Sequence, residues 1–501
     1  MIWSLILPNI RALLGEKTVK INKSIIACAV VMALGASQSA FATEENKDTS
    51  VQIQTDMMVD AIGNVIILSQ TSQTGAIYGN DVRLMQEGDL NGINAAVEGE
   101  NNDTAVTQIG ANNIAISASL GDGNMQEITQ EGEANEVEST VTGNENSVAI
   151  AQEGDGYLGY GNLVINTVEG NSNEITVNQG DGGHWMLNRN MQGSGNIVDT
   201  LQSGTWNEVH LNNVIGHNNE IEVEQDGHWS VTRITDIEGS ENSFEIGQDG
   251  DRNKVTIAEV IGDENDIEID QDGYYNQVTS NIFVGSENEV TLNQVGDDNT
   301  STFDVIGDGN EFTVTQAGMG NDSYVGVAGN DNDFTVIQTG NYNESHVVNF
   351  NGFENDIDVI QSGGNENVSV IQASGPGSSL IADANEIDVT QTGNMNDSIV
   401  NMSTILDSNS NTIDIAQSGD LNALDILVEG SGHTIDIAQT GNENLITGAN
   451  GDAMLIGGIG IELSIEQVGN GNLVEGDVIS GFGSIAITQV GDWNSATIVQ
   501  Q

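Results

Sequence analysis

The residues best suited to chemistry in this chain are carboxamides that recur at a nearly fixed spacing. Eighteen glutamines follow one another, mostly 22 or 23 residues apart, and fourteen open the pattern Gln-x-Gly-x-x-Asn. A carboxamide donates and accepts hydrogen bonds without titrating, so it can join strands but does not act as an acid or a base. A period of this length indicates a repeat architecture. The eighteen glutamines are Gln86, Gln108, Gln130, Gln152, Gln179, Gln202, Gln225, Gln248, Gln271, Gln294, Gln316, Gln338, Gln361, Gln391, Gln417, Gln439, Gln467 and Gln489.

Motifs typical of enzymes are missing from the sequence. It contains no phosphate-binding loop, nucleophile elbow or zinc-ligand spacing. The chain has 75 acidic residues, so no single carboxylate pair stands out as a catalytic dyad. A right-handed β-helix polysaccharide lyase is the formal enzymatic alternative, but such a site usually carries basic residues, and only six remain beyond residue 42. We therefore expect neither an enzyme nor a bound cofactor.

The charge of the chain is strongly negative, at −65 from 75 acids and 10 bases. Such a surface disfavours nucleic acids and anionic membranes. It favours a protein that stays soluble at high concentration until it assembles.

Three carboxylates, those of Asp226, Asp249 and Asp272, directly follow repeat glutamines in consecutive repeats. If stacked at strand spacing, they repel by about 0.9 kcal/mol per pair even in water. One interpretation is a solvated face that resists aggregation. The other is a row of divalent-cation sites, because hard cations prefer carboxylate oxygens. No segment matches the Gly-Gly-x-Gly-x-Asp calcium nonapeptide, and the six histidines follow no metal-ligand spacing.

Aromatic residues recur just before the turn asparagine of several repeats, at Trp206, Tyr275, Tyr342 and Trp493. At this position they are expected on turns and partly exposed. They either pack on the turn or present ring faces for adhesion to a surface.

The elements that position these side chains are short strands. Two sets of residues alternate before Gly307: Asn299, Ser301, Phe303 and Val305 in one, and Thr300, Thr302 and Asp304 in the other; the same period of two recurs from Asn310 to Gly318. Alternation with a period of two between turn residues is typical of strands with one buried face. Each repeat is thus two half-repeats of about eleven residues, in the order strand, turn, strand, turn.

Two such strands cannot bury their inner face alone, but they can if each repeat is one coil of a stack. We therefore predict an all-β fold: a β-solenoid of about 18 two-stranded coils of 22–23 residues, with a cross-β-like amyloid architecture. Copies of each residue then stack about 4.8 Å apart. The longer intervals between glutamines, such as 391 to 417 and 439 to 467, are expected to form outward loops.

The predicted functional residues form a structural ladder of stacked amides and turn glycines. No catalytic, cofactor-binding or metal-binding residue is predicted. The ladder consists of Gln86, Gln108, Gln130, Gln202, Gln248, Gln271, Gln294, Gln316, Gln338, Gln391, Gln417, Gln439, Gln467 and Gln489, with Asn276, Asn299, Asn321, Asn343, Gly273, Gly296, Gly318 and Gly340.

The N-terminal region is typical of a secretory signal. Three lysines precede an apolar run from Ser24 to Leu34, and Ala40-Phe41-Ala42 is a small-x-small cleavage site. We expect three segments: a signal peptide over 1–42, a polar secretion or targeting segment over 43–75, and the repeat solenoid over 76–501. The only cysteine, Cys28, falls within the signal.

The repeat unit resembles the curlin repeat of curli amyloid subunits. The last segment, Gln489-Val-Gly-Asp-Trp-Asn494-Ser-Ala-Thr-Ile-Val-Gln500-Gln501, is the closest match. The chain departs from the family in carrying many more repeats, in its acidity, and in placing an apolar residue where a typical unit has a second glutamine.

The resemblance implies export through the curli secretion channel of the outer membrane of a Gram-negative-type bacterium. It also implies assembly on a nucleator subunit into fimbriae at the cell surface. The predicted function is therefore a secreted subunit that polymerises end to end into amyloid fibres for adhesion and biofilm matrix.

The alternative function is a monomeric acidic solenoid that acts as a calcium-dependent adhesin or an ice-binding protein. Ice binding requires regular Thr-x-Thr rows, and the two pairs at 300–302 and 313–315 do not recur in register. Divalent cations stay a possible partner at this stage.

Overall fold

The computed structural model describes residues 47–53, 63–71, 79–155, 161–210, 212, 214–216, 219–235, 237–239, 241–262, 264–284, 287, 289–306, 311–327, 333–350, 354–373, 380 and 382–500. The expected signal peptide (1–42) lies outside the described residues, as does much of the expected secretion segment (43–75). The described residues contain one 3-10 helix, η1 (Ala449–Gly451), and no α-helix.

Three parallel sheets make up the fold. The first is 21-stranded: β1 (Lys47–Ile53), β3 (Asp81–Asp89), β5 (Asp103–Ala111), β7 (Met125–Glu133), β9 (Ser147–Asp155), β11 (Glu174–Gln179), β13 (Ile197–Thr205), β16 (Glu220–His228), β19 (Ser243–Phe244), β20 (Gly247–Asp251), β22 (Asp266–Ile267), β23 (Asp270–Tyr274), β25 (Glu289–Asp297), β27 (Glu311–Met319), β29 (Asp333–Asn341), β31 (Asp356–Asn365), β33 (Glu386–Thr392), β36 (Thr412–Ser418), β38 (Thr434–Thr440), β41 (Ile461–Val468) and β43 (Gly483–Val490).

The opposite face of the solenoid consists of two sheets. The 8-stranded sheet contains β2 (Val65–Thr71), β4 (Gly92–Glu98), β6 (Ile114–Leu120), β8 (Glu136–Thr142), β10 (Leu163–Asn171), β12 (Trp185–Ser194), β14 (Glu208–His210) and β17 (Val231–Arg233). The 15-stranded sheet contains β15 (Val214–Ile215), β18 (Ile237–Glu238), β21 (Ile257–Ile261), β24 (Gln277–Val284), β26 (Thr300–Ile306), β28 (Asp322–Val327), β30 (Glu344–Phe350), β32 (Val368–Gln372), β34 (Asp397–Met402), β35 (Ser408–Asn409), β37 (Ala423–Ser431), β39 (Leu445–Thr447), β40 (Met454–Ile459), β42 (Leu473–Ser480) and β44 (Ser495–Gln500).

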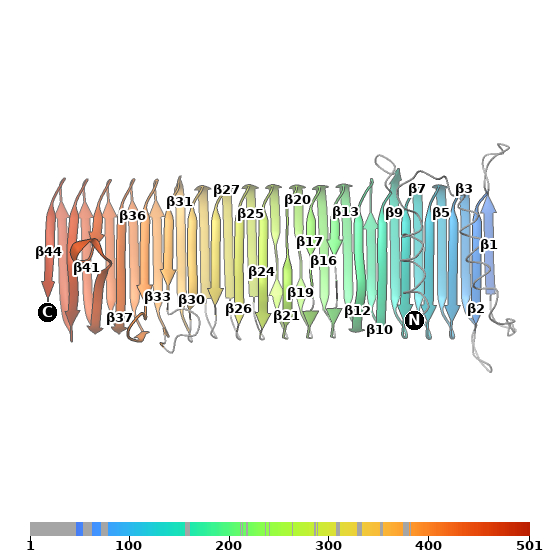
Figure 1. Cartoon of the computed structure of the whole chain (residues 1–501), viewed down its shortest axis with the longest axis horizontal. Coiled ribbons are helices and arrows are strands. Elements are labelled where there is room, and N and C mark those ends of the chain that lie inside the picture. The colour runs from blue at the N-terminus through green and yellow to red at the C-terminus, as the bar shows by residue number, and fades with distance from the viewer. Residues whose placement is uncertain are drawn as a thin grey trace, which may run out of the picture.

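The strands stack in repeat register along one long axis (Figure 1). Between β25 and β27, for example, Gln294 lies opposite Gln316 and Gly296 opposite Gly318. The same register carries on to Gln338 and Gly340 in β29. Since the repeat period equals one coil, equivalent residues fall into columns that run along the axis. The predicted all-β solenoid is therefore confirmed.

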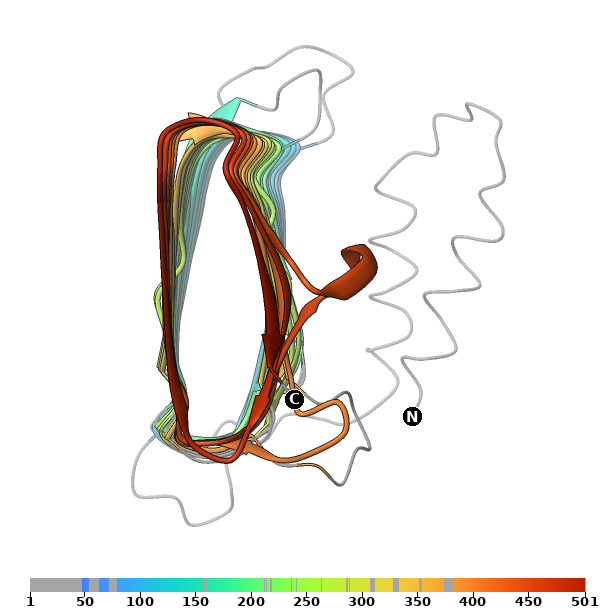
Figure 2. The same ribbon diagram turned by 90° about the vertical axis from the view of Figure 1, so that its left-hand side faces the viewer.

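Viewed along the axis, the coils form a narrow loop whose two long sides are the facing sheets (Figure 2). Side chains alternate between buried and solvent-facing positions along each strand, as in β29, where Phe334, Val336 and Gln338 are buried. The buried apolar residues of both sheets form one continuous core. This burial follows directly from the alternation in the sequence.

Two of the long intervals between glutamines carry segments that leave the coil. Helix η1, in the interval from Gln439 to Gln467, projects from the flat side (Figure 2). In the interval from Gln391 to Gln417, the segment at Thr404–Leu406 is held by the buried carboxylate of Glu429. That carboxylate accepts hydrogen bonds from the backbone N–H groups of Thr404, Ile405 and Leu406 at 2.7–3.0 Å.

Candidate functional site

The repeat glutamines form one uninterrupted ladder inside the solenoid. In every link, the Nε2 of one glutamine donates to the Oε1 of the glutamine in the next coil toward the C-terminus, at 2.7–2.9 Å. All eighteen glutamines are buried. The ladder therefore runs from Gln86 to Gln489 with a single sense of donation.

Nearly every ladder glutamine uses its amide a second time, to tie the two facing sheets together. The Nε2 of Gln316 donates to the backbone oxygen of Thr300 at 2.9 Å, and the Nε2 of Gln391 donates to that of Val368 at 2.8 Å. Both hydrogens of such an amide are thus used, which removes the cost of burying it unpaired.

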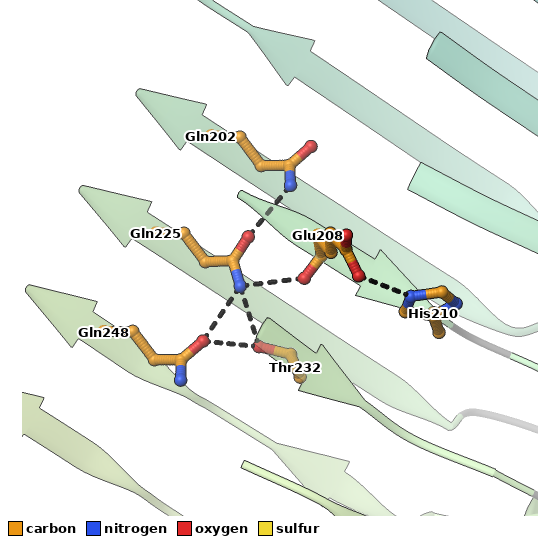
Figure 3. A network of polar contacts seen from close by, with 6 residues as sticks. All are labelled: Gln202, Glu208, His210, Gln225, Thr232 and Gln248. Atoms are coloured by element: carbon orange, nitrogen blue, oxygen red, sulfur yellow. Dashed lines mark hydrogen bonds and ion pairs between the residues drawn. The ribbon is translucent and has the colours of Figure 1, made fainter. Parts of the chain in front are cut away.

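One coil adds a hydroxyl to this network (Figure 3). The Thr232 hydroxyl accepts from Gln225 Nε2 at 3.2 Å and donates to Gln248 Oε1 at 2.8 Å. Gln225 Nε2 also donates to the backbone oxygen of Glu208 at 3.0 Å. Thr232 could not be predicted from the sequence, because its neighbours in the column, Val209 and Val255, give no sign of a polar position.

The turn asparagines form a second ladder, which runs in the opposite sense. The Oδ1 of Asn276 accepts from both the backbone N–H and the Nδ2 of Asn299, each at 3.1 Å. The same pair of bonds links Asn299 to Asn321 and Asn321 to Asn343. In these three links each later residue donates to the earlier one, whereas Asn242 Nδ2 donates forward, to Asn265 Oδ1 at 2.9 Å.

The turn glycines leave no room for a side chain. Gly273, Gly296, Gly318 and Gly340 have φ between 115° and 129°, a region that L side chains rarely adopt. A Cβ on Gly318 would lie 1.8 Å from the carbonyl oxygen of Gly340 in the next coil. That carbonyl instead accepts from Asn321 Nδ2 at 3.0 Å, so glycine and asparagine act as one unit.

Two buried histidines occupy positions where other coils have a turn asparagine. Neither histidine was predicted from the sequence to take this place. His184 follows Asn162 in the column, and its backbone N–H donates to Asn162 Oδ1 at 3.1 Å. The Nδ1 of His433 accepts from the backbone N–H of Ile461 at 3.1 Å. Burial lowers the pKa of His184 and of His433, so both are held as neutral acceptors.

Five buried serines form a column of the facing sheet, and their hydroxyls have no hydrogen-bond partner among the described residues. Most other coils have an apolar residue in this column, such as Val278 or Ala115, and Thr232 belongs to the same column. The five are Ser301, Ser323, Ser345, Ser369 and Ser398.

Carboxylates form columns on the outer face of the 21-stranded sheet. Asp358, Asp388, Asp414 and Asp436 lie opposite one another in four successive coils. Desolvation raises the pKa of Asp388 above its ordinary value, and the charges of Asp358 and Asp414 add to the rise. Desolvation also raises the pKa of Asp414, with a further contribution from Asp436. These columns are thus sites of mutual repulsion.

Asp226, Asp249 and Asp272 also lie in register, in β16, β20 and β23. Asp226 accepts a hydrogen bond from the Ser203 hydroxyl at 2.7 Å. Across the described ranges, no three His, Cys, Asp or Glu side chains are grouped so that they could hold a metal ion.

The four aromatic residues before the turn asparagines occupy left-handed turn positions, with φ between 57° and 63°. The exposed fraction is 37% for Tyr275, 54% for Tyr342 and 74% for Trp493. Three of the rings pack on a glycine one coil earlier: Trp206 on Gly183, Tyr342 on Gly320 and Trp493 on Gly471. Turn packing and partial exposure are therefore combined at this position.

The repeat geometry agrees with the comparisons with known proteins. The curlin associated repeat matches residues 99–132, 216–250, 239–273, 262–294, 285–318, 313–340 and 409–441. None of the curated proteins matches the chain. In the described part of the chain, no helix is long and apolar enough to cross a membrane. The seven matches fall on coils that stack glutamine on glutamine and glycine on glycine, so these segments of the chain are similar to the curlin associated repeat in both sequence and geometry.

Proposed function

We propose that this chain is a secreted structural subunit that polymerises end to end into extracellular, curli-like amyloid fibres for cell adhesion and biofilm matrix. The observation that carries the proposal is the open C-terminal end of the solenoid. β43 pairs with β41 and β44 pairs with β42, and no described strand pairs with their outer edges. Unpaired strand edges are templates for another chain.

The sense of the ladders favours one orientation of the next copy. The glutamine ladder donates toward the C-terminus, and at the other end of the stack β1 pairs with β3 so that Gln52 lies in register with Gln86. The asparagine ladder donates the other way. A head-to-tail contact continues both ladders, whereas two like ends would set donor against donor or acceptor against acceptor.

Apolar surface and charge favour the same contact. In the last coil, Ile485 and Ile487 are only partly buried, and Phe482, Val490 and Trp493 are between 72% and 77% exposed. Ile66 and Leu68 are likewise partly buried near the other end. Residues 479–501 contain one charged side chain, that of Asp492, and residues 61–80 contain none. The ends therefore attract while the acidic sides repel.

The family supports the remaining parts of the proposal. A curli-type nucleator and an outer-membrane secretion channel are the expected partners, at the surface of a Gram-negative-type bacterium. The segment 1–42 is proposed as the signal peptide, 43–75 as the secretion or targeting segment, and 76–501 as the repeat solenoid. No catalytic step is assigned to this subunit.

The test is assembly of the purified chain 43–501, followed by thioflavin fluorescence and fibre diffraction over hours to days. We expect fibres with a spacing of about 4.8 Å along the axis. A double variant, Ile485→Lys with Ile487→Lys, is expected to stop elongation, because it charges the open end. Leu421→Lys, at an exposed turn position, is the matched control.

Two results would contradict the proposal. A wild-type chain that stays monomeric at all salt concentrations would show that the protein does not polymerise. A lysine double variant that elongates like the wild type would show that the C-terminal end is not the contact surface.

A further inference from the structure

One edge of the solenoid carries a cluster of rings beside a column of carboxylates. The cluster occupies the left-handed turn position of four successive coils, at Trp206, Trp229, Arg252 and Tyr275, where φ lies between 59° and 66°. The backbone N–H groups of the last three donate to the preceding coil at 2.9–3.1 Å, so the four residues stack in order. We call this set, together with Tyr274, the aromatic edge.

The side chains of the aromatic edge contact one another along the axis. The ring centroids of Trp206 and Trp229 are 6.2 Å apart and tilted by 40°. The Arg252 guanidinium lies 5.0 Å from the ring centroid of Tyr275 and donates to the Tyr274 hydroxyl at 2.8 Å. Even so, 52% of Trp229 and 38% of Tyr274 remain exposed. Ring surface is therefore available over several neighbouring coils.

Acceptors run parallel to these rings. Asp226, Asp249 and Asp272 form a column in register in the same coils, three residues before each turn position. Carboxylates accept hydrogen bonds from hydroxyl groups. Aromatic faces carry partial negative charge and pack against C–H groups that carry partial positive charge. A partner with both hydroxyl groups and C–H faces matches this combination.

From these contacts we propose that the aromatic edge binds a neutral, extended, β-linked polysaccharide strand that lies parallel to the solenoid axis. A sugar ring presents C–H groups on its faces and hydroxyls at its rim, which match the rings and the carboxylate column. The sites repeat at the coil rise of about 4.8 Å, so a regular polymer can contact several coils at once.

The charges at the aromatic edge favour a neutral polysaccharide over an anionic or a cationic one. The three aspartates repel a polyanion. Arg252, the cation of the cluster, is already engaged by both tyrosines. A polycation would bind the carboxylates, but its affinity would fall steeply with salt and would not depend on the rings.

The experiment titrates soluble, monomeric chain with β-1,4-glucan oligosaccharides and follows tryptophan fluorescence. The test variant is Trp229→Asn with Tyr275→Asn. Asparagine already occupies the same turn position at Asn112, with φ of 59°, so the backbone is preserved. Tyr342→Asn is the matched control, because that ring is exposed in the same position outside the cluster.

We expect the neutral glucan to bind, with little dependence on salt, and the double variant to lose at least tenfold in affinity while the control does not. Parallel titrations use a chitosan oligomer as the cationic glycan and oligogalacturonate as the anionic one. The proposal is overturned if the neutral glucan does not bind, if the double variant binds as well as the wild type, or if only the chitosan oligomer binds. Because the chain is monomeric in this assay, the result is independent of fibre formation.

Discussion

At the scale of single residues, the glutamine ladder requires an amide and not only a polar side chain. Gln271 accepts from Gln248 and donates to both Gln294 and the backbone oxygen of Lys254. An ionised glutamate keeps the acceptor but loses both donors, and it buries a charge. We expect Gln271→Glu to lower the free energy of unfolding by at least about 1–3 kcal/mol, the cost of unpaired buried groups.

Urea denaturation at pH 7 and pH 4 tests this prediction. Protonation gives the glutamate one donor, so part of the loss should be recovered at pH 4, measured relative to the wild type at each pH. Asp272→Asn, at the exposed position next in the chain, is the control and should not lower the free energy of unfolding, because it removes only one of the stacked carboxylates. Equal stability of Gln271→Glu and the wild type at pH 7 would contradict a structural role for the ladder.

The turn glycines make an equally strict requirement. Gly318→Ala would bring a Cβ within 1.8 Å of a backbone oxygen of the next coil, and backbone cannot yield as a side chain does. We expect a loss of about 4 kcal/mol or more, in the range of severe steric damage. Hydrogen exchange should show that the loss of protection is centred on β27 and β29.

Gly92→Ala is the matched control for this substitution. A Cβ at Gly92 meets no atom within 4 Å, and the residue is in a strand. Protection of β27 and β29 in Gly318→Ala that equals the protection in Gly92→Ala would show that the coils separate easily, contrary to the tight stacking.

At the scale of strands, the carboxylate columns predict that mild acid stabilises the outer face. Burial and neighbouring charges raise the pKa of Asp388 and Asp414 in the folded chain. The folded state then binds more protons than the unfolded state in the window above pH 3.8, so the free energy of unfolding rises as the pH falls through that window. Asp388→Asn with Asp414→Asn should reduce this rise by the share of these two residues and stabilise the chain at pH 7.

The measurement must separate the aspartates from the buried histidines. The lowered pKa values of His184 and His433 act with the opposite sign, because stability is lost as the pH falls below 6.5. The comparison is therefore the difference in unfolding midpoint between the wild type and the double asparagine variant from pH 7 to pH 4. A difference that does not change with pH would contradict repulsion within the column.

The elements were predictable to the extent that the repeat is regular. Alternation placed Phe334 and Val336 on the buried face, and the shared period placed Gln316 over Gln338. The clamp of Glu429 on the Thr404–Leu406 segment was not predictable, because its partners come from the backbone of an irregular interval. The Thr232 and His184 contacts were missed for a different reason: the adjacent coils carry Val209 and Val255 beside Thr232 and Asn162 before His184, so the neighbours of each residue give no sign of its contact.

At the scale of the whole molecule, the direction in which each ladder donates could not be predicted from the sequence either. Glutamine and asparagine carry the same amide group, and their order along the chain does not say which one donates forward. The direction depends on how each side chain reaches the next coil and the facing strand. Such opposed ladders give the rod two different ends, and this is the basis for expecting a polar fibre.

The charge of the whole rod predicts how assembly responds to salt. Two strongly acidic rods must approach end to end, and their sides repel over the screening length. This length falls from about 30 Å at 0.01 M to about 10 Å at 0.1 M ionic strength. We expect the elongation rate, followed by thioflavin fluorescence, to rise steeply over this range and then level off.

A comparison of calcium with magnesium at equal ionic strength separates screening from a specific site. Both ions carry the same charge, but calcium prefers flexible sites with many oxygen ligands and magnesium keeps its water. The described residues contain no cluster of three His, Cys, Asp or Glu side chains that could hold a metal ion, so we expect the two ions to give the same elongation rate. Faster elongation in calcium alone would instead show that the aspartate columns, such as that of Asp226, Asp249 and Asp272, rearrange into calcium sites during assembly.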